Sequence, residues 1–164
     1  MIELDYFFYG VGGEMISYIL IQFSVNEPWS VLDGDELLGR LEKKDGEWVN
    51  VPEGVLNLEM IQKIGRFIDK QHYHVLPSDI LSRWPKLVAE VIIQSDREFL
   101  VVCREDINFE TFERMFTKFV PGMLKDEWHV NFRVYNSDFS SDFMLEAKGK
   151  REELSYDPIR KWQL

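Results

Sequence analysis

The pattern of apolar and polar positions is clearest in the middle of the chain, across residues 88–103. Two apolar runs, residues 88–93 and 99–103, flank the polar stretch 94–98. Both runs are rich in β-branched residues and too short for ordinary helices, so they predict the two strands of an antiparallel hairpin. Their near-continuous apolarity predicts that both strands lie in the middle of a sheet. We therefore expect this hairpin to form the centre of the core.

A second hairpin is predicted near the N-terminus. Residues 3–9 and 14–25 are rich in aromatic and β-branched side chains, and the glycine-rich segment 10–13 joins them. A helix over residues 14–23 is the alternative. The glycine-rich segment is not followed by the Gly-Lys-Ser/Thr sequence of a phosphate-binding loop, so we interpret it as a turn.

Residues 26–54 contain four glycines, two prolines and most of the excess acid of the chain. The sequence Lys-Asp-Gly-Glu at 44–47 is typical of a tight hairpin turn. It predicts paired strands over residues 37–43 and 48–51. The leucines of the first strand would also fit one or two turns of helix, which is the alternative.

Helical periodicity begins after Asn57, a residue type that caps helix N-termini. The spacing that follows predicts an amphipathic helix over residues 58–71 that covers one face of a sheet. Its apolar stripe consists of Leu58, Ile61, Ile64, Phe67 and Ile68. Ser78 predicts the start of a second, short helix, and Pro85 limits its end.

The last helix and two more strands are predicted after residue 107. Asn108 is a cap for a helix over residues 109–119, which Pro121 and the following glycine end. The phenylalanines and methionine of its stripe favour core packing over the wall of a ligand pocket. Residues 127–135 alternate between apolar and polar side chains, and residues 143–147 form a returning strand.

Together these elements predict an α+β fold, with a mainly antiparallel sheet built of hairpins and two or three helices packed against it. At 164 residues we expect a single domain over 1–164. Its N-terminal third, residues 1–60, is acidic. The C-terminal tail, residues 149–164, ends in Ile159, Trp162 and Leu164, and we expect these side chains to dock on the body or on a second copy, which would give a homo-oligomer.

The net charge of −10 belongs almost wholly to that acidic third. Residues 1–60 carry twelve acidic and three basic residues, whereas residues 61–164 are nearly balanced, with seventeen and sixteen. Such a surface repels phosphates, so nucleic acid is not an expected partner, and a basic protein is. No apolar run approaches the roughly 20 residues of a membrane helix. The single cysteine and the absence of a basic leader favour a cytoplasmic protein.

Candidate residues for chemistry are few. His72 and His74 would project on the same side of an extended segment, but two ligands do not make a metal site. Cys103 and His129 could meet in space beside an acid, although a buried, unreactive thiol is the expected state of Cys103. The acidic run that begins at Asp33 fails the spacing of a calcium loop. We therefore expect no catalytic residue, no metal and no cofactor.

The remaining feature is a set of tryptophans embedded in acidic sequence. We expect these residues to bind a partner: Trp29, Asp33, Asp35, Glu36, Asp45, Glu47 and Trp48. The alternative is that both tryptophans are core and the acids only keep the protein in solution. The sequence thus favours a non-catalytic protein-binding domain, of the kind of an inhibitor or immunity protein. An enzyme or small-ligand binder with a pocket between sheet and helices, and a self-associating subunit, are the alternatives.

Overall fold

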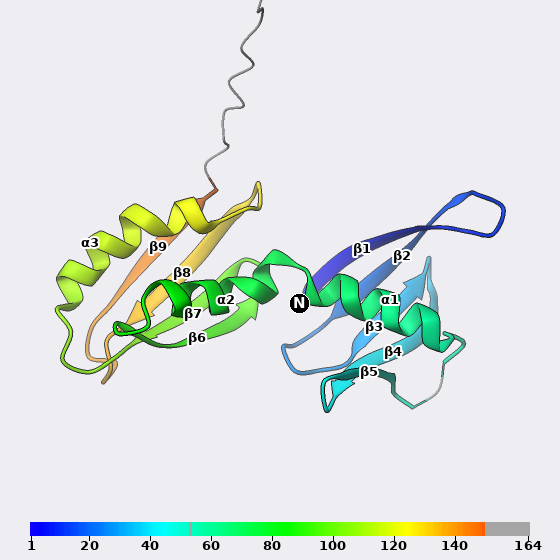
Figure 1. The fold of residues 1–164 in the computed structure, drawn as a ribbon, viewed down its shortest axis with the longest axis horizontal. Coiled ribbons are helices and arrows are strands. Elements are labelled where there is room, and N and C mark those ends of the chain that lie inside the picture. Colours follow the sequence, from blue (N-terminus) through cyan, green and yellow to red (C-terminus); the bar gives the residue numbers. More distant parts are fainter. Residues whose placement is uncertain (53, 150–164) are drawn as a thin grey trace, which may run out of the picture.

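The structure is a computed structural model that describes residues 1–52 and 54–149, and it contains two β-sheets (Figure 1). The first, which we call the N-terminal sheet, is antiparallel throughout and follows the chain in the order β1-β2-β3-β4-β5. Its strands are β1 (Ile2–Tyr9), β2 (Met15–Gln22), β3 (Trp29–Asp33), β4 (Glu36–Lys44) and β5 (Glu47–Asn50). Asp45 and Gly46 both have positive φ angles, 51° and 83°, which is the geometry of a tight type I′ hairpin turn.

The second, the C-terminal sheet, has the order β6-β7-β8-β9. Its strands are β6 (Val88–Ser95), β7 (Glu98–Cys103), β8 (His129–Tyr135) and β9 (Asp142–Lys148). The β6–β7 and β8–β9 pairs are antiparallel hairpins, whereas β7 and β8 run parallel. A parallel pair needs a crossover connection, and here that connection contains a helix.

Helices lie on one side of each sheet (Figure 1). They are α1 (Leu58–Asp69), α2 (His72–Arg83), α3 (Phe109–Phe119) and the short 3₁₀ helix η1 (Val120–Met123). Asn57 caps α1 and Asn108 caps α3, because each side-chain oxygen accepts a hydrogen bond from the backbone N–H three residues later, at 2.8 and 2.9 Å. None of the described helices has the length and apolar character that crossing a membrane requires.

The covered face of the N-terminal sheet packs against α1. Leu20, Val31 and Leu41 from the middle strands are fully buried there, as are Ile64 and Ile68 of the helix. Gly65 of α1 lies on the indole of Trp48, and a Cβ at this position would overlap that ring. Close approach of helix and sheet at this point therefore depends on a glycine.

The covered face of the C-terminal sheet is a cluster of aromatic rings. Phe116 of α3 contacts Phe132 of β8 edge to face, with 5.3 Å between ring centroids, and Phe132 stacks on Phe99 of β7. Trp84, just after α2, contacts both Phe112 and Phe116. The phenylalanine stripe predicted for α3 is thus part of the core, although Phe119 at the end of that helix is exposed.

The predicted α+β fold is confirmed, and so are the three hairpins and the caps at Asn57 and Asn108. The strands belong to two sheets, and β3 was not predicted. Only β7 of the central hairpin is an inner strand. The prediction that its partner strand β6 also lies in the middle of a sheet is wrong, since β6 lies at the sheet edge and Ile92 is exposed.

The second predicted helix begins earlier than expected. Ser78 does not cap it, because α2 starts at His72 and contains Pro77 in its interior. Burial of Tyr73, Leu76 and Ile80 on one side of α2 outweighs the missing N–H of the proline. The docked tail falls on residues 150–164, outside the described part of the chain, and the single domain likewise stays a prediction.

Candidate functional site

Alternation along the strands of the N-terminal sheet creates a second face opposite α1, which we call the open face. Tyr6 of β1 contacts Phe67 of α1, so its neighbours Asp5 and Phe7 point away from the helix. The strand register extends this face across the sheet. Asp5 lies beside Ile19, Ile19 beside Leu32, and Leu32 beside Leu37.

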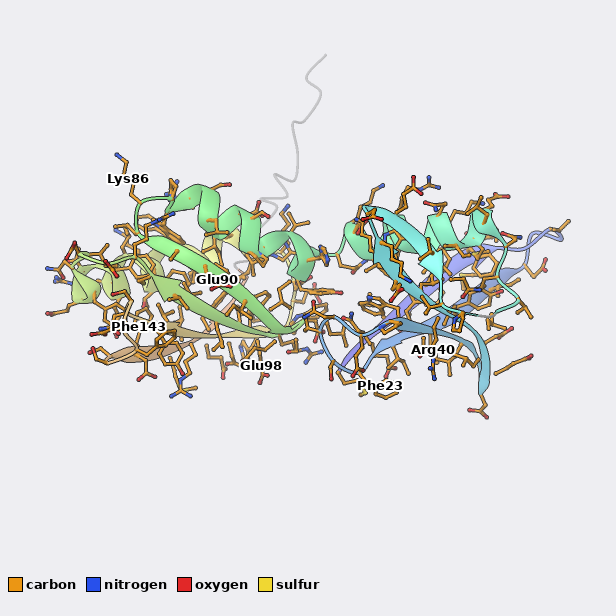
Figure 2. All side chains as sticks on the ribbon, turned by 90° about the horizontal axis from the view of Figure 1, so that it is seen from below. Phe23, Arg40, Lys86, Glu90, Glu98 and Phe143 are labelled. Atoms are coloured by element: carbon orange, nitrogen blue, oxygen red, sulfur yellow. The ribbon has the colours of Figure 1, made fainter. Side chains whose placement is uncertain are left out.

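The open face has an apolar centre. Its most exposed large side chains are Phe7, Tyr9, Met15, Phe23 and Leu37, and Phe7 is 58% exposed. Ile19, Ile21 and Leu32 are half-buried between them. Figure 2 shows Phe23 and Arg40 on the side of the sheet away from α1, and within the described ranges no helix or strand lies over them. A contiguous apolar surface of this kind is typical of an interaction site.

Acidic residues surround this centre and remain largely unpaired. Residues 1–52 carry ten acidic and three basic residues. Of these acids only Glu42 has a basic partner among the described residues, Lys44 at 2.6 Å. Lys43 pairs instead with Asp69 of α1, at 2.9 Å. The N-terminal sheet therefore projects a negative potential that its own lysines do not cancel.

The tryptophans predicted as binding residues do not lie on this surface. Trp29 and Trp48 are only 4% and 7% exposed, and both are part of the hydrophobic core. The indole N–H of Trp48 donates a hydrogen bond to Asp69 at 3.1 Å. Neither ring is therefore an exposed anchor on the open face, and the structure shows the alternative, burial of both rings.

The predicted acidic residues are all exposed, but the structure separates them into two groups. Asp33, Asp35 and Glu36 surround the β3–β4 turn, whereas Asp45 and Glu47 lie at the β4–β5 turn. The two turns are at opposite ends of the nine-residue strand β4, roughly 27 Å apart. The open face between them was not predicted. The sequence signal for this face is the alternation in residues 3–9, which places Glu3, Asp5, Phe7 and Tyr9 on one side.

The strand register keeps Cys103 and His129, the candidates for a thiol site, far apart. In the parallel β7–β8 pair Val102 lies beside Tyr135, so Cys103 is at the opposite end of β8 from His129. Seven strand residues separate the two levels, roughly 23 Å. Cys103 is also buried, and this burial raises its pKa to about 12. A protonated, buried thiol is not a nucleophile.

The two histidines beside Tyr73 are helical, contrary to the extended segment that was expected. His72 and His74 are two residues apart in the first turn of α2, so they point about 200° apart. Burial lowers the pKa of His72, while the Asp126 carboxylate acts in the opposite direction. Within residues 1–52 and 54–149 no three His, Cys, Asp or Glu side chains are grouped in a way that could hold a metal ion.

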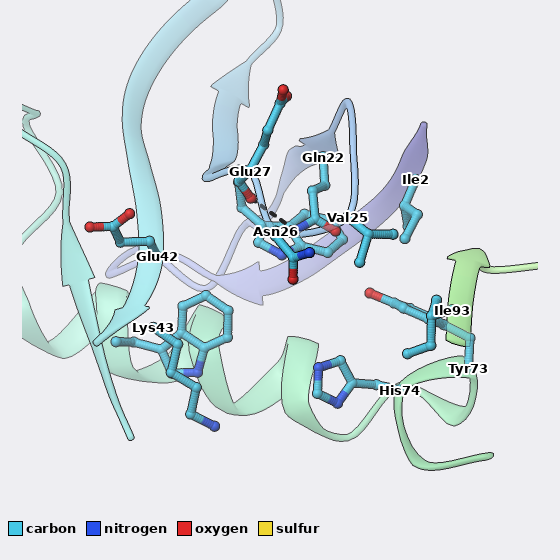
Figure 3. A pocket seen from close by; sticks show the side chains of 12 residues that line it. Ile2, Gln22, Val25, Asn26, Glu27, Glu42, Lys43, Tyr73, His74 and Ile93 are labelled. Atoms are coloured by element: carbon cyan, nitrogen blue, oxygen red, sulfur yellow. Dashed lines mark hydrogen bonds between the residues drawn. The ribbon is translucent and has the colours of Figure 1, made fainter. Parts of the chain in front are cut away.

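A pocket of about 390 Å³ lies where the two sheets meet, on the covered side of the N-terminal sheet (Figure 3). Both halves of the chain line it, with Ile2, Asn26, Trp29 and Lys43 on one side and Tyr73 and Ile93 on the other. Neither Cys103 nor His129 is part of it. The pocket therefore brings together none of the residues considered for catalysis except His74.

Comparison of the chain with protein-family models, with curated proteins and with solved structures finds no match in any of the three. Inference about function therefore rests on the open face and the pocket themselves.

Proposed function

We propose that the chain is a non-catalytic protein-binding domain, and that the open face of the N-terminal sheet binds a protein with a basic surface. The observation that carries this proposal is the combination of an uncovered apolar centre with acidic side chains that lack internal partners. Apolar contact would supply most of the affinity. The unpaired acids would orient the partner and speed its approach.

The size of the open face sets how much of an interface it can supply. Five strands spaced ~4.8 Å apart and up to eight or nine residues long give a face of about 20 Å by about 25 Å. That is on the order of 500 Å² before side-chain relief is counted. One side of a standard protein interface buries ~800 Å². The open face alone is smaller than this, so an interface of standard size would also bury its acidic margins.

Charge favours a different protein over a second copy of this chain. Two copies that met through their open faces would bring Glu3 and Asp5 of one against the same residues of the other, or against its remaining acids. A basic partner meets no such repulsion. An inhibitor or immunity-type protein that neutralises a basic toxin or nuclease in the cytoplasm is one biological form of this proposal, and it rests on size and charge alone.

A matched pair of variants tests the proposal. The open-face variant is Asp5→Lys with Phe7→Ser, and the control on the C-terminal sheet is Glu98→Lys with Met144→Ser. All four positions are exposed, so both variants should fold. Each protein is used as bait in lysate of the native host, with elution by a salt gradient and identification by mass spectrometry.

We expect a basic protein that wild type and the control variant both retain and that the open-face variant loses. Equal recovery by all three baits, or loss with the control variant alone, would overturn the proposal. Two other occupants of the open face are distinguished by analytical ultracentrifugation of the full chain and by the same capture experiment with a shortened chain. A dimer that Phe7→Ser dissociates would identify a second copy. Capture that appears only after deletion of residues 150–164 would identify the tail.

A further inference from the structure

The pocket between the two sheets holds a buried polar group with no partner. Tyr73, in the first turn of α2, is 5% exposed, and its hydroxyl has no hydrogen-bond partner among the described residues. Figure 3 shows this hydroxyl directed into the pocket, on the same side as the amide of Asn26. Buried hydroxyls are nearly always paired, so an unpaired one that faces a pocket needs a partner from outside the chain.

The charge around this pocket favours a cation over an anion. Glu27 and Glu42 line it, and within residues 1–52 and 54–149 Lys43 is the only lysine or arginine that does. Glu42 is already paired with Lys44 at 2.6 Å, and the ammonium of Lys43 is bound to both oxygens of Asp69 at 3.0 and 2.9 Å. Glu27 is therefore the lining carboxylate that neither lysine neutralises. Burial, and after it the carboxylate of Asp96, raises the pKa of Tyr73, which places a further negative charge near the hydroxyl.

Aromatic rings in the wall add to this preference. Trp29 and Trp48 both line the pocket. The ammonium of Lys43 lies 5.8 Å from the centre of the Trp48 ring, so this indole already contacts a cation. Indole rings attract cations through the negative potential of their faces, and attraction grows when the cation leaves water.

We propose that this pocket binds an organic cation, a primary ammonium or guanidinium group on a short aliphatic chain. The charged group donates to the Tyr73 hydroxyl and to the side-chain oxygen of Asn26. The aliphatic part packs on Ile2 and Ile93, which line the pocket beside Tyr73. This site is separate from the open face, because it lies on the covered side of the N-terminal sheet. Either proposal can fail without the other.

Four small molecules of matched length test the charge preference. We would titrate the full chain with n-butylammonium, n-butylguanidinium, butyrate and 1-butanol, and follow backbone, Asn26 side-chain and Trp48 indole N–H signals by NMR. We expect saturable shifts with one or both cations in the roughly millimolar range, as befits fragments of this size. Saturation by butyrate at these signals, or shifts no larger with the cations than with butanol, would overturn the proposal.

Three variants locate the site. Tyr73→Phe removes only the unpaired hydroxyl and should weaken cation binding about tenfold. The control Tyr135→Phe, in the C-terminal sheet, should leave binding unchanged. Lys43→Met removes a competing positive charge and should strengthen binding about threefold. A weaker cation complex in Lys43→Met, or an unchanged one in Tyr73→Phe, would contradict the assignment.

The cation could come from a free small molecule or from a lysine or arginine side chain of another protein. The pentapeptide Gly-Gly-Arg-Gly-Gly, blocked at both ends, separates these sources. Binding at least as tight as that of n-butylguanidinium would identify a side chain of a partner. If the peptide fails to bind while the free cation saturates, the ligand is a small molecule.

Discussion

The two sheets share one plan, with helices on one side and an open face on the other, yet their open faces differ in chemistry. On the C-terminal sheet, among the described residues, two exposed acids pair across strands, whereas Glu90 and Glu98 have no basic partner. Arg133 of β8 meets Asp142 of β9 at 3.1 Å, and His129 meets Glu146 at 3.1 Å. On the N-terminal sheet the acids lack such partners, and the centre is apolar.

This difference separates a face whose acids are partly paired across strands from one whose acids are not. Cross-strand pairs join Asp142 and Glu146 to side chains of β8, and the exposed large apolar side chains of these strands are Ile92 and Met144, with Trp128 and Phe139 in the flanking segments, among the described residues. On the N-terminal sheet the apolar surface is uncovered and the acidic side chains largely lack basic partners. We therefore propose that partner binding occurs on the N-terminal sheet, and the variants below test that proposal.

The largest expected effect contrasts the two faces of the N-terminal sheet. Leu20→Ala deletes a side chain that is 0% exposed and should lower the free energy of unfolding by about 2–5 kcal/mol. Phe7→Ala deletes a larger but exposed side chain and should cost under about 1 kcal/mol. Urea unfolding followed by circular dichroism measures both. Similar costs at the two positions would mean that something covers the open face in the isolated chain.

Charge reversal distinguishes the two open faces by kinetics. Asp5→Lys should slow association with the basic partner about tenfold at low salt, because it inverts a charge beside the apolar centre. Glu98→Lys, on the C-terminal sheet, should change the rate much less. Stopped-flow mixing at several salt concentrations gives both rates, and the difference should shrink as screening increases. Equal slowing by the two variants would show that only net charge matters.

Removal of a cross-strand pair tests whether the C-terminal face is merely structural. Arg133→Met breaks the ion pair with Asp142 and the contact with the ring of Tyr135. Both partners are about half exposed, so the loss in free energy of unfolding should be under about 1 kcal/mol. Partner affinity should not change. If affinity falls as much as with the open-face variant, the placement on the N-terminal sheet fails.

The smallest expected effect lies at the start of α2 and depends on pH. Burial lowers the pKa of His72, so the unfolded chain takes up a proton there before the folded chain does. Stability should therefore fall as pH decreases from about 7 to about 5, through the ordinary histidine range. In His72→Gln the free energy of unfolding should fall less over this pH range, by a difference of under about 1 kcal/mol. An identical slope in the variant would show that other groups cause the loss.

Local signals in the sequence predicted most elements but not their assembly. The Asp45-Gly46 turn and the caps at Asn57 and Asn108 act over a few residues, so the pattern alone identified them. The edge position of β6 depends on where β8 pairs, more than 30 residues away. The apolar run in β6 therefore predicted an inner strand that the register does not provide.

The same limit explains the candidate site. Burial of Trp48 depends on Gly65 of α1, which approaches the indole only after the helix has packed on the sheet. Acidic neighbours in the sequence could not show this. The open face, by contrast, was present in the alternation of residues 3–9. The alternation defines two faces of the strand, and the exposed one could be identified only once α1 was known to cover the other.

The most direct test of the central claim is a methyl NMR spectrum of the full chain with and without its partner. The probes are Ile19, Ile21, Leu32 and Leu37 on the open face, and Ile92, Leu100 and Met144 on the C-terminal sheet. The account predicts that the first set shifts or broadens on complex formation while the second set stays unchanged. Shifts confined to the second set, or to the helix-covered side, would contradict it.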